Sequence, residues 1–137
     1  MKLKLLLVQN GKVIFQMPLS PSDWQKETLQ DEFDSMEEDL QKFSRIFDAL
    51  SHETRLRMMR RLVQEENRTL SFADFMRDLN LNPKIVWENS RKLTEGGLLI
   101  KTSRGKYSCS ESGQMAFMMM SLALHRLIDA MEELESH

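Results

Sequence analysis

The sequence contains few residues that cross-link or interrupt a chain, since its 137 residues include one cysteine, three prolines and five glycines. The lone Cys109 cannot form an intramolecular disulfide, which favours a reducing, cytoplasmic location over secretion. Long apolar runs are missing as well, because residues 115–124, the most apolar stretch, fall short of the ~20 residues of a membrane span. The apolar run at residues 5–8 is too short for a signal peptide. We therefore expect a soluble protein with no membrane partner.

Motifs that carry catalysis or bind metals are also missing. The sequence has no glycine-rich phosphate loop, no nucleophile elbow and no spaced metal triad. Cys109, His125, Asp129 and His137 do not reproduce the paired spacing that a metal site needs. We therefore predict that the protein is not an enzyme, uses no cofactor and holds no metal. Cys109 is expected to be buried, with a redox role left open, and His125 to be packed or hydrogen-bonded among apolar neighbours.

Charge is unevenly distributed along the chain, although the net charge is only −2. Residues 50–110 carry twelve basic and seven acidic residues, whereas residues 21–49 carry three basic and nine acidic ones. Residues 111–137 have one basic and five acidic residues. A basic centre between acidic flanks is typical of a domain that binds a polyanion, and an ordinary mixed surface is the alternative interpretation.

The start of the chain predicts a β-hairpin, which forms a separate element over residues 1–20. Residues 2–9 and 12–17 are rich in Leu, Val, Ile and Phe, and Asn10-Gly11 between them favours a type I′ turn. Pro18 and Pro21 are expected to end strand pairing. The main domain would then occupy residues 21–137.

A long amphipathic helix is predicted over about residues 23–50, with its cap at Ser22 or Asp23. Apolar residues recur there at alternating spacings of four and three over three heptads, which is typical of a helix that packs against another helix. These residues are Leu29, Phe33, Met36, Leu40, Phe43, Phe47 and Leu50. The acidic run at residues 31–39 lies off this seam and is interpreted as a solvated face.

Three shorter helices are predicted in the basic centre of the chain. Ser51 is expected to cap the first, and Ser71 the second, whose apolar residues share one face. Asn82 followed by Pro83 is a typical start for the third, which runs to Glu95 and ends at two glycines. The short turn at residues 80–81 joins the second and third helices into a helix-turn-helix.

A second hairpin and a last helix complete the expected order. Residues 98–103 and 106–109 are predicted to pair around Arg104-Gly105, and Ser110 or Ser112 to cap a helix over residues 111–135. The first half of this helix is apolar nearly all round and is expected to be buried on several sides. Its seam continues to the end with Phe117, Met120, Leu124, Leu127, Met131 and Leu134.

Several blocks of the sequence resemble the arsenic-repressor (ArsR) type of winged helix-turn-helix regulator. Residues 47–57 read FDALSHETRLR, and an ALSHETRLR string is typical of the start of that family's second helix. The spaced block Leu81-Asn82-Pro83, Val86, Leu93, Glu95, Gly97 and Leu98 resembles its recognition helix and the exit into its wing. The resemblance covers about residues 43–135, and the hairpin at residues 1–20 lies outside it. Ser90 departs from the pattern, because the family usually has a larger apolar residue there.

The resemblance implies a mainly α fold with a small β part, an α+β winged helix-turn-helix, in which the long first and last helices form a homodimer interface. It implies a cytoplasmic, dimeric regulator of transcription, a repressor by expectation, that binds double-stranded DNA. The helix at residues 82–95 would read the major groove and the wing at residues 98–109 would contact phosphate or the minor groove. The expected contact residues are Asn82, Lys84, Ile85, Trp87, Glu88, Arg91, Thr102, Ser103, Arg104 and Lys106.

Some of these residues have a second interpretation. Asn82 can spend its side chain on capping, Glu88 can pair with Lys84 or Lys92, and Trp87 can pack under the wing instead of contacting DNA. The arginines of residues 55–61 are interpreted mainly as a solvated face. A winged-helix module that binds another protein and no DNA is the alternative function, and the nature of an effector, small molecule or protein, stays open.

Overall fold

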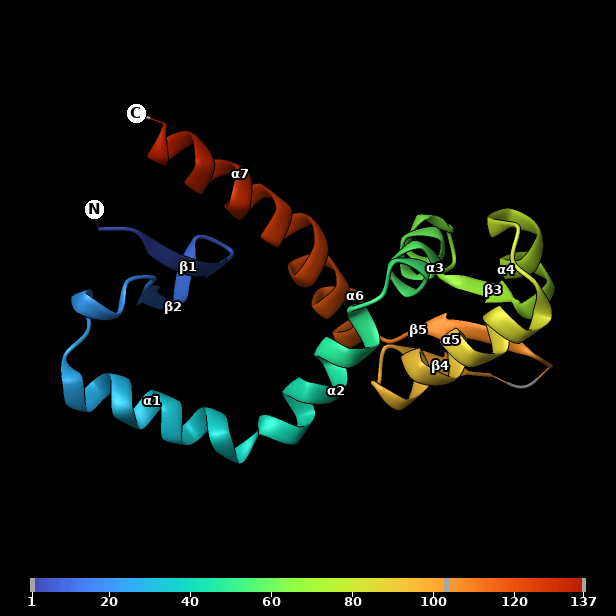
Figure 1. Ribbon diagram of the computed structural model, residues 1–137, viewed down its shortest axis with the longest axis horizontal. Coiled ribbons are helices and arrows are strands. Elements are labelled where there is room, and N and C mark those ends of the chain that lie inside the picture. The colour runs from blue at the N-terminus through green and yellow to red at the C-terminus, as the bar shows by residue number, and fades with distance from the viewer. Residues whose placement is uncertain (1, 103, 137) are drawn as a thin grey trace. The chain divides into compact units, whose positions relative to one another are not determined.

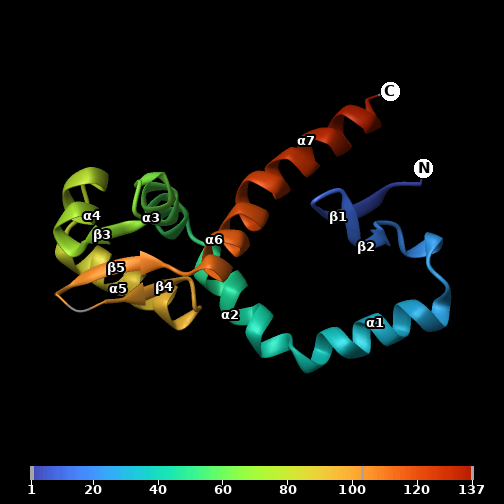
Figure 2. The ribbon, with the colours of Figure 1, turned by 180° about the vertical axis from the view of Figure 1, so that it is seen from behind.

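The computed structural model describes residues 2–102 and 104–136, and its fold is of mixed α+β type (Figures 1 and 2). The chain divides into two compact units, Met1–Leu40 and Gln41–His137. The boundary between these units lies after Leu40, whereas the predicted one lies after residue 20. Among the described residues, every helix is too short or too polar to cross a membrane.

The first unit begins with the predicted hairpin. Strands β1 (Lys4–Gln9) and β2 (Lys12–Pro18) pair antiparallel, with an irregularity between Leu7 and Val8. Asn10 and Gly11 have φ values of 52° and 79°, as a type I′ turn requires. The pairing ends at Pro18 as predicted, and the strand is one residue longer than predicted, because Pro18 is itself opposite Lys4. A proline is tolerated at the end of an edge strand, where its missing N–H leaves no ladder bond open.

The cap predicted at Ser22 or Asp23 is wrong, since Pro21 starts a short 3₁₀ turn, η1 (Pro21–Asp23), that includes both residues. The Trp24 indole Nε1 then donates to the Pro18 carbonyl at 2.9 Å. Helix α1 (Lys26–Glu38) begins only after Gln25, which has an extended backbone and no side-chain capping bond. The sequence pattern therefore placed this helix about three residues too early.

The predicted helix over residues 23–50 is two helices, α1 and α2 (Leu40–Leu50). Asp39 leaves the helical region at φ −103° and ψ 12°, and its amide bonds to the carbonyls of Met36 and Glu37. Acidic residues are unfavourable at the C-terminal end of a helix because the helix dipole is negative there. The C-terminal end of α1 carries three acidic residues, Glu37, Glu38 and Asp39. This acidic run therefore interrupts a helix that the apolar seam alone predicts to be continuous.

The second unit contains the remaining elements. After α2 come α3 (Glu53–Gln64), β3 (Thr69–Ser71), α4 (Phe72–Leu79), α5 (Pro83–Glu95), β4 (Leu99–Lys101), β5 (Lys106–Cys109) and α6 (Glu111–Met118). The three strands form one antiparallel sheet in the order β3-β5-β4. The sequence predicted the pairing of β4 with β5 and missed β3. The cap of α3 is His52 and not Ser51, since the His52 Nδ1 accepts from the Thr54 amide at 3.2 Å.

The core of the second unit lies between helices α3, α4 and α5 and the sheet. The largest side chains with no appreciable exposure are Met58, Met59, Leu62, Phe75, Val86, Leu93 and Leu98. The rings of Phe75 on α4 and Tyr107 on β5 lie 6.0 Å apart, which joins the helices to the sheet. This core fixes α5 against α3 and α4 and leaves its opposite face outward.

The end of α5 approaches the end of α2 closely at Gly96. A Cβ atom added to Gly96 would lie 2.6 Å from the Cβ of Ala49, which is itself buried. The neighbouring Gly97 has no such contact but has a φ of 77°, a conformation that other residues rarely adopt. The glycine pair predicted to end α5 is therefore needed for space at one position and for backbone conformation at the other.

The last helix runs from α6 through a π-helical turn, η2 (Met119–Ala123), into α7 (Leu124–Glu135). Its predicted cap is present, because Ser110 Oγ accepts from the Gly113 amide at 2.9 Å. The expectation that its first half is buried on several sides is wrong for the single chain. Phe117 is buried, whereas Met115, Met118, Met119 and Leu122 are between 45% and 67% exposed. One face of this helix packs on α3 and, at Gly113, against the backbone of Leu98, and the rest of its apolar surface has no cover within the second unit.

Candidate nucleic-acid interface

Helix α5 is held in place at its start by two local motifs. Ser71 and Asp74 form a capping box at the start of α4, and Asn80 ends α4 in the left-handed region at φ 53°. Asn82 Oδ1 then accepts from the Ile85 amide at 2.9 Å, which caps α5 with Pro83 in its first turn. The turn predicted at residues 80–81 and the predicted cap are both present. The side chain of Asn82 is therefore used, at least in part, within the protein.

The outward face of α5 carries most of the predicted contact residues. Val86 and Leu93 are fully buried, as predicted, and the exposed or half-exposed positions are Lys84, Ile85, Trp87, Glu88 and Arg91. Trp87 is 57% exposed, so it does not pack under the β4–β5 hairpin. The Arg91 guanidinium lies 5.3 Å from the centre of the Trp87 ring, within cation–π range.

The cations of α5 are each matched by a carboxylate. Lys84 lies 4.0 Å from Glu88, the ion pair that the sequence predicted as the role of Glu88. Arg91 pairs with Glu95 at 3.1 Å, and Lys92 with Asp48 at 3.6 Å. These pairs are exposed and hence weak, so the carboxylates reduce the positive field of α5 without holding its side chains rigidly.

The β4–β5 hairpin supplies cations that are not matched in this way. Lys101, Arg104 and Lys106 are exposed, and within residues 2–102 and 104–136 none of them has a carboxylate in ion-pair range. The Thr102 hydroxyl and amide both bond to the Lys106 carbonyl, at 3.0 and 2.8 Å, so that hydroxyl has an internal partner. Ser103, also predicted as a contact, lies outside the described residues. Lys101 was missed in the sequence because it precedes the turn.

A shallow pocket of about 210 Å³ brings α5 and the hairpin together. Trp87 and Arg91 line it from α5, and Lys101 and Tyr107 from the strands. Beneath it, the buried Ser90 hydroxyl lies 3.4 Å from that of Tyr107 and 3.2 Å from the Trp87 carbonyl. The small side chain of Ser90 thus stands opposite a large aromatic ring. Two elements that the sequence assigned to one surface are adjacent in the structure.

Arg55 has an internal role that the sequence interpretation missed. Its guanidinium donates to the carbonyls of Ala49 and Asp48 at 2.7 and 2.9 Å, and to Asn89 Oδ1 at 2.9 Å. Asn89 is buried on α5 and donates in turn to the Ile85 carbonyl at 2.8 Å. Arg55 is thus an exception to the interpretation of residues 55–61 as mainly a solvated face. This residue links the end of α2 to the middle of α5.

Ion pairs also fix α4 beside α3. Arg61 on α3 pairs with Asp78 on α4 at 3.0 Å and with Glu65 at 2.9 Å, and the Glu65 hydrogen bond is the largest cause that raises the pKa of Arg61. The pKa of Asp74 is lowered, chiefly by the hydrogen bond from the Ser71 backbone amide and then by that from the Ser71 side chain. Arg77, 2.8 Å from Asp74, lowers it further. Helix α4 is thus secured at its start and along one side.

The remaining candidate ligands lie apart from this surface. Cys109 is buried as predicted, and burial raises the pKa of its thiol, while the charge of Arg68 opposes that rise. The expectation that His125 is packed or hydrogen-bonded is wrong, because its side chain is 71% exposed and lies 3.7 Å from Asp129. In the part of the chain that the structure describes, no three His, Cys, Asp or Glu side chains gather around a common point.

The chain matches no protein-family model and no curated protein sequence. Its function must therefore be argued from its own residues, and the surface that α5 shares with the β4–β5 hairpin is the strongest candidate for a site.

Proposed function

We propose that the protein is a dimeric, ArsR-like winged helix-turn-helix regulator of transcription that binds double-stranded DNA. In this proposal α4 and α5 are the helix-turn-helix, and the β4–β5 hairpin is the wing. The observation that carries the proposal is the shared outward surface of α5 and the hairpin, where Trp87 and Arg91 line the same pocket as Lys101. A rigid helix with an exposed polar face beside a cationic hairpin fits a major groove and its flanking phosphates.

The proposed contacts divide by chemistry. Lys84 and Arg91 are assigned to phosphate or guanine, since an exposed ion pair is exchanged for a phosphate at little cost. Arg104, Lys106 and the additional Lys101 are assigned to phosphates or the minor groove. Trp87 and Ile85 are assigned to apolar contact with base edges, and Glu88 to holding Lys84. In a two-fold dimer the two α5 helices would lie ~34 Å apart, so the operator would be an inverted repeat.

A second candidate function rests on one observation. Glu88, Glu95 and Asp48 each pair with a cation of α5, which weakens the positive charge that DNA binding needs. A mixed-charge helix face beside an exposed tryptophan also fits a protein partner. The two functions differ in how binding depends on salt.

The test is a salt series on duplexes selected from a random library. DNA binding predicts a linear fall of log affinity with log salt. The double variant Lys84→Ala with Arg104→Ala removes two cations from each protomer of the proposed dimer and should reduce the magnitude of that slope by about four. Lys42→Ala with Arg126→Ala removes the same charge from exposed positions on α2 and α7 and should leave the slope unchanged. Undetectable duplex binding at low salt would overturn the proposal, as would a Lys84 and Arg104 variant that binds as well as the wild type.

A further inference from the structure

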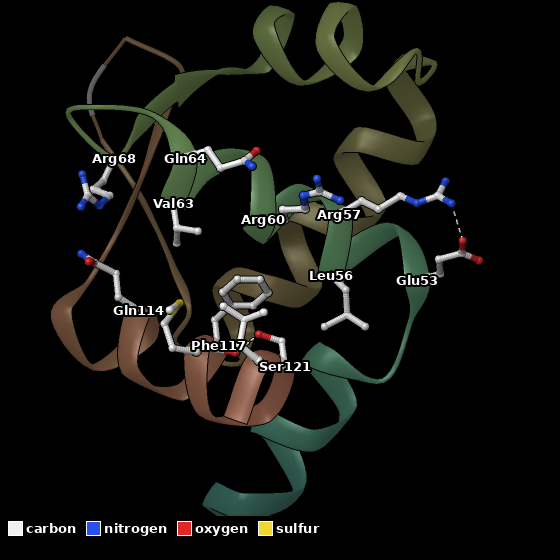
Figure 3. A pocket seen from close by; sticks show the side chains of 12 residues that line it. Glu53, Leu56, Arg57, Arg60, Val63, Gln64, Arg68, Gln114, Phe117 and Ser121 are labelled. Atoms are coloured by element: carbon white, nitrogen blue, oxygen red, sulfur yellow. Dashed lines mark hydrogen bonds and ion pairs between the residues drawn. The ribbon is translucent and has the colours of Figure 1, made fainter. Parts of the chain in front are cut away.

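A large cavity, separate from the proposed DNA surface, lies between α3 and the start of the last helix (Figure 3). Its volume of about 770 Å³ falls within the range of small-molecule sites. One wall is α3 and the other is α6 with the π-helical turn η2, and none of its lining residues belongs to α5 or the β4–β5 hairpin. All of these elements lie in the second compact unit.

The interior of this cavity is apolar. Leu56 and Val63 line it from α3, and Phe117, Met118 and Leu122 from the last helix, with Phe117 and Leu56 drawn in Figure 3 between the two walls. Ser121 also lines it, but its hydroxyl bonds to the Phe117 carbonyl and so offers little to a ligand. π-helical turns are rare and occur frequently at functional sites. The walls therefore suit a hydrocarbon or aromatic body.

The rim of the cavity is cationic. Arg57, Arg60 and Arg68 stand around it, against one carboxylate, Glu53, which pairs with Arg57 at 2.5 Å. Arg60 is exposed and has no carboxylate partner among the residues that the structure describes. Arg68 donates to the backbone carbonyls of Glu65 and Glu66, and it has no carboxylate in ion-pair range within residues 2–102 and 104–136. Two arginines at the mouth of an apolar cavity are thus available to an anion.

We propose that this cavity binds an amphipathic anion, a carboxylate that carries an apolar chain or ring. The apolar body would occupy the space between Val63, Phe117 and Met118, and the carboxylate would lie between Arg60 and Arg68. Arginine suits this role because its planar guanidinium matches a carboxylate with two parallel hydrogen bonds. Binding at this cavity does not depend on the proposed function in DNA binding.

The test uses the full chain with labelled methionine methyl groups and decanoate as the probe, below its micelle concentration. Saturable shifts of the Met118 methyl resonance are expected, because Met118 lines the cavity. The cationic analogue decyltrimethylammonium has the same chain and the opposite charge, and it should bind at least tenfold more weakly. Equal binding of the two probes, or no saturable shift with decanoate, would overturn the proposal.

Variants test the two parts of the site separately. Arg60→Ala with Arg68→Ala should weaken decanoate binding roughly tenfold, as two exposed charge pairs allow, whereas Arg126→Ala on α7 should not change it. Leu122→Trp, at a position 55% exposed and therefore tolerant of a larger side chain, should block the cavity. Unchanged decanoate affinity in either cavity variant would overturn the proposal. So would a halved mass of Leu122→Trp in light scattering, because a second copy of the chain would then be the occupant.

Discussion

At the scale of single residues, the predicted roles divide by the range of their contacts, and Arg55 is the clearest long-range case. Replacement of Arg55 by alanine should destabilise the protein by about 1–3 kcal/mol, because the buried Asn89 oxygen and the Ala49 carbonyl would lose their donor. Urea denaturation measures the change. Arg60→Ala is the matched control on the same helix and should stay within about 0.5 kcal/mol of the wild type. Similar losses in the two variants would show that the Arg55 network adds no stability.

Asp74 should make stability depend on pH. Its pKa is lowered in the folded protein from the ordinary 3.8, so its contribution is complete above that value and is lost as pH falls through the folded pKa. Asp74→Ala should cost about 1 kcal/mol at neutral pH through loss of the capping box. The cost should shrink in acid, as denaturation of both proteins across the acid range would show. A cost that is independent of pH would exclude an electrostatic contribution from this carboxylate.

At the scale of elements, the sequence predicts turns and helix starts that are marked by particular residue pairs. It does not predict elements that depend on distant residues or on weak local features. Asn10-Gly11 and Asn82-Pro83 gave the hairpin and the start of α5 within one or two residues. Strand β3 has three residues and exists because Leu70 lies opposite Tyr107, far along the chain, so no local periodicity announces it. The break at Asp39 was overlooked because the apolar seam is continuous across it, although the acidic run beside it was visible.

The break between α1 and α2 should respond to charge. Glu37→Lys with Glu38→Lys replaces acidic side chains near the negative end of α1 by basic ones, each worth about 0.3–1 kcal/mol to the helix. Far-ultraviolet circular dichroism should then show more helix and a later thermal loss of helical signal. Glu27→Lys, in the first turn of α1, should have the opposite effect. An unchanged helical signal in the double variant would exclude charge as the cause of the break.

At the scale of the whole molecule, apolar side chains remain exposed in both units. In the helices of the first and last seams they include Phe33, Met36, Phe43, Phe47, Leu124, Met131 and Leu134, each between 39% and 54% exposed. Exposed apolar surface of this extent is typical of an association site. The sequence predicted these seams from spacing, and the proposed dimer would give them their cover.

The proposed dimer predicts a mass of two chains in light scattering at micromolar concentration. Met131→Glu with Leu134→Glu introduces charge into the seam of α7 and should return the mass of one chain, since an unpaired buried charge is costly. Arg126→Glu also changes the charge of α7, outside the seam, and should keep the dimer. If the wild-type protein scattered light as a single chain, the proposal that a dimer holds two α5 helices one DNA turn apart would be overturned.

The two adjacent glycines at the end of α5 should differ sharply in a saturation mutagenesis library. Gly96 has an ordinary φ, but a Cβ atom added there would lie 2.6 Å from the Cβ of Ala49 and 3.1 Å from the Arg45 carbonyl oxygen, so even alanine would separate two helix ends. Glycine at position 49 would remove the closer of these two contacts. Gly97 faces open space at positive φ, so asparagine would be accepted in preference to alanine or valine. The two adjacent glycines thus meet two unrelated requirements. Gly96 is needed for space, and Gly97 is needed for a left-handed backbone conformation.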